Sequence, residues 1–169
     1  HDAGINLENI ALYKELAAEN NMAVRVNGML SVEDKTWQSA LNQGVYVSDN
    51  DLFKLDSVKI SADGALGSRG AALIADYSDL PHHKGLLLYN EAELDKLIAT
   101  AMQAGFQVNT HAIGDNANYL VLNHYEKWID KSQSKDRRHR IEHAQVLQLD
   151  DVIVVGQFYH VKSSIGILQ

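Results

Sequence analysis

Two histidines stand at the ends of short apolar runs, where strands would finish. His111 lies in the stretch VNTHAIGD, and His143 closes a similar run in HRIEHAQ. A neutral imidazole carries a lone pair that binds divalent metals, and two imidazoles in equivalent places of consecutive units can share one ion. A histidine that only forms hydrogen bonds at a strand end is the structural alternative for each. The pair predicts a metal site.

The elements that must position these histidines alternate along the chain. Apolar spacing and capping residues predict helices, and β-rich runs between them predict about five strands. The expected helices cover residues 7–21 after Asn6 as the cap, 32–44, 90–105 with the capping pair Asn90 and Glu93, and 116–131. The expected strands cover residues 22–30, 57–63, 106–112, 139–144 and a run within 160–168.

Such alternation favours an α/β fold with a parallel sheet, either an open doubly wound sheet or a TIM (β/α)8 barrel. The carboxyl ends of the strands, where His111 and His143 fall, carry the chemistry in both folds. A whole barrel takes about 250 residues. We therefore expect the 169 residues to be a fragment of a single barrel domain. The opening HDAGIN, without an initiator methionine or signal peptide, also predicts a piece of a longer polypeptide.

Composition excludes several classes of partner. A net charge of -7 and a pI near 5.5 argue against nucleic acid. No apolar run approaches the roughly 20 residues that span a bilayer, so no membrane partner is expected. The absence of cysteine excludes disulfides and thiolate metal sites, and it leaves a cytoplasmic or a periplasmic location open.

Further candidates lie on the strand and loop before the histidine pair. Lys59 is inside the run SVKISAD, which ends in Asp63, and Arg69 lies in the loop DGALGSRGAAL. The planar guanidinium of Arg69 suits a carboxylate, and we take Arg69 and Asp63 as candidate substrate-binding residues. The structural alternatives are an ion pair of Arg69 with Asp63 or Asp76, and of Lys59 with Asp63.

Two acidic residues flank the histidines. Asp115 either caps the helix that begins at residue 116 or accepts a hydrogen bond from His111, and the cap is the simpler interpretation. Glu142 alternates with His143 along a strand, which predicts that it faces the other side of the sheet and forms an ion pair.

Three long stretches together resemble a known family. These are VKISADGALGSRGAALIADYSD, KGLLLYNEAELDKLIATAMQAGFQVNTHAIGDNA and RHRIEHAQVLQLDD. They are similar to the amidohydrolase superfamily, in particular to the amidohydrolase family 3 branch of metal-dependent hydrolases. The resemblance runs from the start of the chain to Asp151. It implies a metal-binding TIM barrel that hydrolyses a non-peptide or N-acyl amide C–N bond.

The resemblance also implies roles for single residues. His111 and His143 match the metal-binding histidines that end the fifth and sixth strands, and Lys59 matches a carboxylated lysine that bridges two metals. The implied cofactor is one or two divalent ions, zinc first, with manganese or iron as alternatives. The first-strand His-x-His pair and the general-base aspartate of the family are absent here, so no catalytic residue is assigned within this chain. Residues 152–169 depart from the family pattern and receive no role.

Two other classes of function fit the same residues. Lys59 could form a Schiff base with a carbonyl substrate in a TIM-barrel lyase. Alternatively, the chain is a noncatalytic barrel fragment. For the hydrolase we expect a small-molecule amide as substrate and the remaining barrel segments of the same polypeptide as structural partners; a homo-oligomer is left open.

Overall fold

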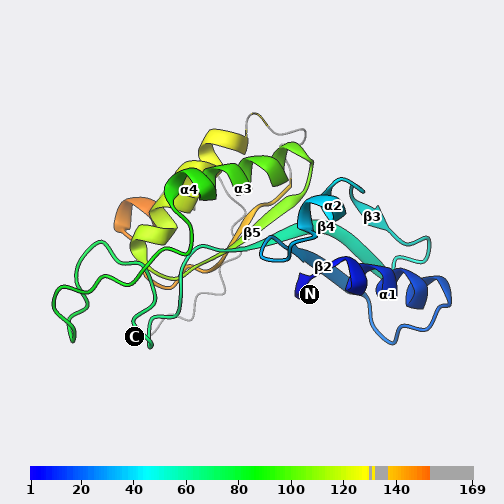
Figure 1. The fold of residues 1–169 in the computed structure, drawn as a ribbon, viewed down its shortest axis with the longest axis horizontal. Helices are drawn as coiled ribbons and strands as arrows, with labels where there is room; N and C mark the ends of the chain where they lie inside the picture. The colour runs from blue at the N-terminus through cyan, green and yellow to red at the C-terminus, as the bar shows by residue number, and fades with distance from the viewer. Residues whose placement is uncertain (130, 132–136, 153–169) are drawn as a thin grey trace.

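The parallel strands of the sheet follow one another in chain order. The structure is a computed structural model that describes residues 1–129, 131 and 137–152. Within these residues the sheet order is β1-β2-β4-β5-β6, each strand parallel to the next (Figure 1). A doubly wound sheet reverses its strand order at a switch point, so the unbroken order is that of a barrel wall. The strands are β1 (Asp2–Ile5), β2 (Val26–Ser31), β4 (Phe53–Ser61), β5 (Gln107–Ala112) and β6 (Arg140–His143), and the short β3 (Tyr46–Val47) pairs antiparallel with β4.

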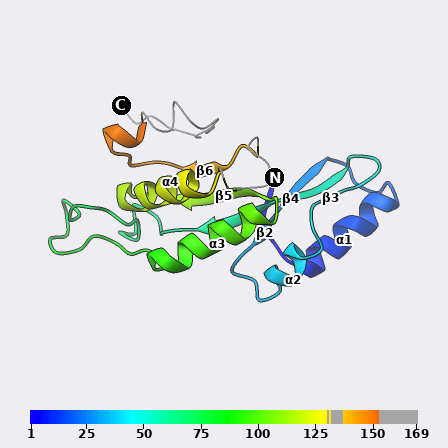
Figure 2. The same cartoon turned by 90° about the horizontal axis from the view of Figure 1, so that it is seen from above.

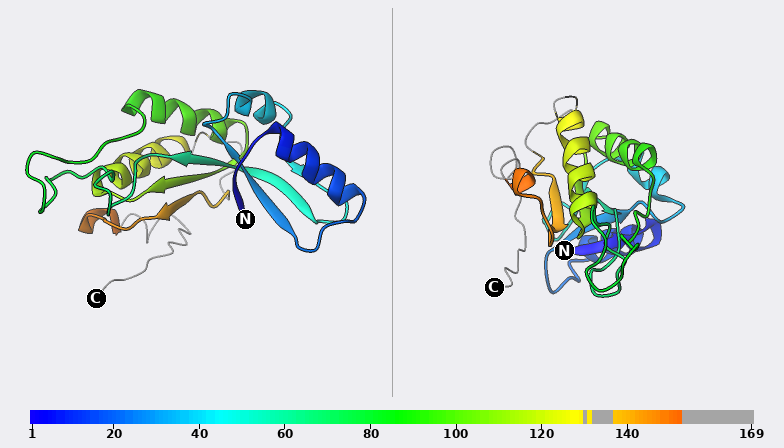
Figure 3. Two further views of the ribbon diagram at one scale, coloured as in Figure 1. Left: turned by 60° about the horizontal axis from the view of Figure 1, so that its bottom comes forward. Right: turned by 90° about the vertical axis from the view of Figure 1, so that its left-hand side faces the viewer.

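The helices pack on one face of this sheet (Figure 3). They are α1 (Leu7–Ala18), α2 (Trp37–Leu41), α3 (Glu91–Gln103) and α4 (Asp115–Ile129). Phe53 of β4 stacks on Tyr13 of α1 with ring centroids 5.0 Å apart. Thr110 of β5 shares a hydrogen bond of 2.8 Å with the hydroxyl of Tyr125 on α4. Among the described residues, none of these helices is long and apolar enough to cross a membrane.

A bulge in β4 decides which side chains face away from the helices. Gly28 of β2 pairs with Leu55 and Met29 pairs with Ser57, so Asp56 is an extra residue in β4. The buried face therefore changes parity along the strand. Beyond the bulge, Lys59 lies on the face opposite the helices.

Local capping sets the ends of the longer helices. The Asn90 side chain accepts from the Glu93 N–H, and the Glu93 carboxylate accepts from the Asn90 N–H, both at 3.0 Å. Asn6 caps α1 in the same way with Asn9. Gly105 follows the last turn of α3 with φ of 82°, a conformation that glycine adopts at little cost. The predicted starts of both helices are confirmed.

Helices α3 and α4 lie side by side (Figure 2). Asp95 of α3 joins them, because its carboxylate accepts from Lys127 at 2.8 Å and from the indole of Trp128 at 2.8 Å. His124 of α4 lies 3.0 Å from the same carboxylate. This cluster fixes α4, and so the segment that follows β5.

Several elements differ from the predictions. The helix expected over 32–44 is only five residues long, because Val32 continues the pairing to β4 through the Lys59 carbonyl at 3.2 Å. The Asp34 carboxylate then accepts from the Thr36 N–H at 2.8 Å and forms a turn. β1 and β3 were not predicted, and β4 begins four residues earlier, at Phe53 rather than Ser57. The strand expected within 160–168 lies outside the described residues.

Candidate functional site

The structure brings His111 and His143 together. They come from neighbouring parallel strands, with Ala112 of β5 opposite His143 of β6. Their ring centroids are 4.6 Å apart, and the ring planes meet at 73°. Two imidazoles this close can reach one cation, because zinc–nitrogen bonds are about 2.0–2.1 Å long.

His143 leaves the regular pleat at the end of β6. Its φ is 79°, and that of Ala144 is 44°. The left-handed backbone redirects the side chain, so His143 and Glu142 line the same open depression. The prediction that Glu142 faces the opposite side from His143 is therefore wrong. The predicted ion pair is confirmed, because Arg140 Nη2 lies 2.8 Å from Glu142 Oε1.

The depression lies on the sheet face that the helices leave uncovered. Its volume is about 570 Å³, and it is lined by His1, Ala3, Met29, Lys59, Arg140, Glu142 and His143. The lining residues come from β1 or its start and from β2, β4 and β6. A wall of this kind is the inner face of a barrel, seen here from its open side.

Electrostatics keep His143 in its neutral form. Burial lowers the pKa of His143, and positive charge on His111 or Lys59 lowers it further. The carboxylates of Glu142 and Asp63 act in the opposite direction. A lowered pKa leaves the imidazole uncharged near neutral pH, with a lone pair available for a metal.

Lys59 lies on the floor of the same depression. Burial lowers its pKa, against the raising effects of Glu142 and Glu33. Within the described chain Lys59 forms no ion pair, so the predicted alternative of a pair with Asp63 is not observed. A lowered pKa increases the share of free amine, which is the nucleophilic form of lysine.

Asp63 and Arg69 do not line the depression. The Asp63 side chain has no exposed surface, and its carboxylate accepts from the backbone N–H groups of Ala72, Ile113 and Gly114. A carboxylate enclosed in this way offers nothing to a substrate, so the structure does not support the substrate-binding role predicted for Asp63. Arg69 pairs with neither Asp63 nor Asp76, the two partners that the sequence suggested.

The partner of Arg69 is Asp79, farther along the same loop. The guanidinium donates from Nε at 3.2 Å and from Nη2 at 2.7 Å to the two carboxylate oxygens. Both side chains are exposed. This pair ties the loop to itself, and the substrate-binding role of Arg69 stays a prediction.

Asn109 is a site neighbour that the sequence analysis missed. It lies between Lys59 and Arg140 in the cross-strand register. The residue is fully buried, yet neither side-chain amide atom has a hydrogen-bond partner in the part of the chain that the structure describes. The alternation of FQVNTHA could have revealed it, since Asn109 and His111 share one face of the strand.

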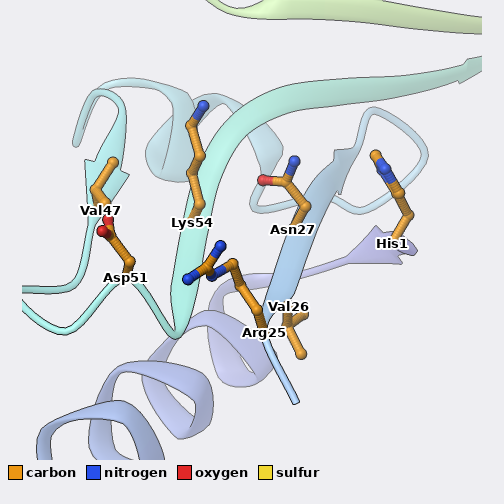
Figure 4. Close-up of a pocket in the computed structure, with 7 residues that line it drawn as sticks. All are labelled: His1, Arg25, Val26, Asn27, Val47, Asp51 and Lys54. Carbon is orange, nitrogen blue, oxygen red and sulfur yellow. The ribbon is translucent and has the colours of Figure 1, made fainter.

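A second pocket lies at the opposite ends of the strands. It has a volume of about 430 Å³ and includes Arg25, just before β2, and Lys54 near the start of β4 (Figure 4). Lys54 is already paired with Asp56 at 2.6 Å. Because chemistry gathers at the carboxyl ends of barrel strands, we do not assign this pocket to the active site.

The described residues supply only part of a metal site. Among them, no group of three or more His, Cys, Asp or Glu side chains is arranged to hold an ion. The two adjacent imidazoles, one of them with a lowered pKa, do fit a metal. A complete coordination sphere needs ligands from elsewhere in the protein.

Comparison with known proteins decides the family. A profile described as the amidohydrolase family matches residues 3–155. The chain belongs to the amidohydrolase family. The resemblance seen in the sequence is thereby confirmed, and with it the α/β architecture as part of a TIM barrel.

Relatives of this amidohydrolase chain include a plant and a bacterial protein. LONG AFTER FAR-RED 3 of Arabidopsis thaliana is 34% identical over 152 residues, which are 88% of this chain and 26% of the relative. YtcJ of Bacillus subtilis (strain 168), which bears the name of an amidohydrolase, is 37% identical over 137 residues, or 80% of this chain and 24% of YtcJ. The chain thus spans about a quarter of the length of the curated relatives it matches.

Two solved structures share the fold. An uncharacterized metal-dependent hydrolase from Pyrococcus horikoshii OT3 superposes with a TM-score of 0.79 at 25% identity, over 96% of this chain and 32% of the other. One from Pyrococcus furiosus gives a TM-score of 0.76 at 28% identity, over 92% and 31%. The described amidohydrolase sheet therefore corresponds to about a third of those proteins.

Proposed function

We propose that this chain supplies the metal-binding wall of an enzyme that hydrolyses a non-peptide or N-acyl amide C–N bond. The observation that carries the proposal is the contact of the His111 and His143 rings at the carboxyl ends of β5 and β6, with Lys59 in the depression that His143 lines. Membership of the amidohydrolase family and the similarity to two metal-dependent hydrolases of known structure support it.

His111 and His143 would hold a divalent ion. The described site contains nitrogen and oxygen donors and no thiol, which suits zinc first and manganese or iron next. A bound ion lowers the pKa of water to about 7 and polarises the scissile carbonyl. The neutral state of His143 keeps its lone pair directed to a cation rather than to a proton.

We propose in addition that Lys59 is carboxylated. Its free amine adds to CO2, a new N–C bond forms, the proton goes to water, and an anionic carbamate with two oxygens results. The lowered pKa of Lys59 favours the reacting amine. The side-chain NH2 group of the neighbouring Asn109, which has no hydrogen-bond partner among the described residues, could donate to the carbamate. Such an anion could bridge two ions, which gives the two-metal version of the site.

The general base and the remaining ligands belong to other parts of the complete protein. The Arg140–Glu142 pair lines the depression. In this proposal it places one positive and one negative group where a polar small-molecule amide would enter.

Metal content and turnover of the complete protein test the proposal. We expect His111→Ala and His143→Ala each to weaken metal binding by about tenfold to a hundredfold or more and to abolish hydrolysis of N-acyl amino acids and formamides. His82→Ala is the matched control, because that side chain is 97% exposed in a distant loop and should change neither. Unchanged metal content in the double His111/His143 variant would refute the site.

Lys59 separates the proposal from its alternatives. For a carboxylated lysine, 13C-labelled bicarbonate should give a carbamate signal that disappears in Lys59→Ala, and small carboxylic acids should restore part of the metal binding. Borohydride trapping of a carbonyl substrate on Lys59 in metal-free protein would instead favour the Schiff-base lyase. If the protein neither binds metal nor is trapped by borohydride, the remaining alternative is a noncatalytic barrel fragment.

A further inference from the structure

Asp63 lies just beyond β4 and joins two loops from inside the protein. Its carboxylate accepts from the Ala72 N–H in the loop after β4, at 2.9 Å. It also accepts from the N–H groups of Ile113 and Gly114 in the loop after β5, at 2.9 and 2.8 Å. These three donors leave no exposed surface on the side chain.

The hydrogen bonds use the two oxygens unequally. Oδ2 accepts from Ala72 and from Gly114, which occupies both of its lone pairs, whereas Oδ1 accepts from Ile113 only. One lone pair on Oδ1 therefore remains. Oδ1 is the oxygen that lies 3.4 Å from Nε2 of His111.

The two ring nitrogens of His111 lie in different surroundings. Nε2 is fully buried without a hydrogen-bond partner among the described residues. The exposed surface of the side chain, 18%, therefore lies elsewhere on it. A lone pair on Nε2 would face the carboxylate lone pair across 3.4 Å, which is repulsive, whereas an N–H there is attracted. The neutral ring therefore carries its proton on Nε2 and its lone pair on Nδ1.

We propose that Asp63 is the positioning residue for His111. It holds the ring with Nε2–H toward the buried carboxylate and leaves Nδ1 as the metal-binding atom. The 3.4 Å separation is longer than an ordinary hydrogen bond, and such contacts shorten when the other nitrogen binds a cation. The tautomer stands on the geometry alone, and only the metal-binding part rests on the proposed function.

Asp115 provides a matched control for the loop-joining part of this role. Its Oδ1 accepts from Ile74 in the loop after β4, at 2.9 Å, and from Asn116 at 3.0 Å. It thus ties the same two loops as Asp63, and in the part of the chain that the structure describes it forms no hydrogen bond with His111. Asp115→Asn should lower stability and leave the ring unchanged.

The first readout is the His111 tautomer in the metal-free complete protein. Nitrogen-15 NMR of histidine-labelled protein near neutral pH should show the Nε2–H form. Asp63→Asn should shift the ring toward a mixture of tautomers and weaken zinc binding by about tenfold to a hundredfold, while Asp115→Asn changes neither beyond about twofold. An Nδ1–H tautomer in the parent protein would overturn the proposal.

A second pair of variants covers the case in which Asp63→Asn does not fold. The side-chain oxygen of asparagine takes the place of Nδ1, and that of glutamine the place of Nε2. We expect His111→Asn to retain more zinc than His111→Gln, and the reverse order would overturn the proposal. If the parent protein shows the Nε2–H tautomer but binds no metal at all, the positioning role stands and the proposed function fails.

Discussion

A buried histidine next to β5 and β6 accepts a hydrogen bond from the backbone. His139, just before β6, is 3% exposed, and its Nδ1 accepts from the Val108 N–H at 3.0 Å. Accepting this bond requires an unprotonated Nδ1. Burial, and secondly the charge of Arg137, lower the pKa of His139 from 6.5 to about 4. Burial lowers the pKa of both His143 and His139. His143 is thereby a candidate metal ligand, whereas His139 is an acceptor for the backbone.

The titration of His139 predicts a loss of stability in acid. Between pH 6.5 and about 4 the unfolded chain binds more protons at this residue than the folded chain. Its contribution is complete above pH 6.5, decreases as the pH falls toward 4, and is constant below that. The shift corresponds to about 3 kcal/mol. In urea unfolding of the complete protein at pH 7 and pH 4.5, His139→Gln should be less sensitive to acid than the parent, and an equal sensitivity would contradict the assignment.

At the scale of elements, the loops that follow the strands are joined by hydrogen bonds, and these bonds support the site. The Ala62 N–H donates to the His111 carbonyl at 2.8 Å, and the Ala144 N–H donates to Ala112 at 3.1 Å. Asn118 of α4 donates to Gly114 at 2.9 Å and to Val146 at 3.1 Å, which ties the loop after β6 as well. The histidine pair is therefore supported by bonds between three loops rather than by either strand alone.

Gly114 lies where two of these loops approach each other closely. A Cβ at this position would lie 1.9 Å from the Ala72 carbonyl oxygen, and part of the backbone would have to move. Gly114→Ala should therefore destabilise the complete protein by about 1–3 kcal/mol and weaken metal binding by displacing the loop that follows His111. Gly67→Ala is the control, because a Cβ there meets nothing within 4 Å. Equal urea midpoints for the two variants would show that the loops are not rigidly joined.

At the scale of the whole molecule, the described sheet is a wall and not a closed barrel. β1 and β6 are the outer strands among the described residues, and each leaves one row of backbone groups without a strand partner there. The homologous chains are about three and a half times as long, and the superposed structures about three times. The remaining strands of an eight-stranded barrel would cover both edges and close the depression.

Residues 1–169 on their own should therefore be inactive. The chain contains no His-x-His pair to complete the ligand set, and two open edges favour association. We expect no zinc- or manganese-dependent hydrolysis of N-acyl amino acids or formamides by this piece, and turnover by the complete protein under the same conditions. Robust turnover by the isolated 169 residues would show that the site does not need the other strands.

Short-range patterns in the sequence were enough to predict the elements that local contacts stabilise. The capping bonds of Asn90 and Glu93 span three residues, so α3 could be read directly, and the strands ending near His111 and His143 followed from their apolar runs. The helix predicted over residues 32–44 was too long, because Val32 pairs with β4. Helical spacing does not register such a competing long-range contact.

The arrangement of the site was decided by tertiary structure. Asp63 bonds to residues 50 and 51 positions away, and its role beside His111 cannot be seen from its neighbours in sequence. The sequence offered Asp115, not Asp63, as a possible partner of His111, and it favoured a helix cap for that residue. The pairing of Arg69 with Asp79 was not predicted either. The positive φ of His143 turned its ring into the depression that Glu142 lines. Residue types and strand ends determined which groups could bind a metal, whereas strand order and long-range hydrogen bonds decided which of them meet.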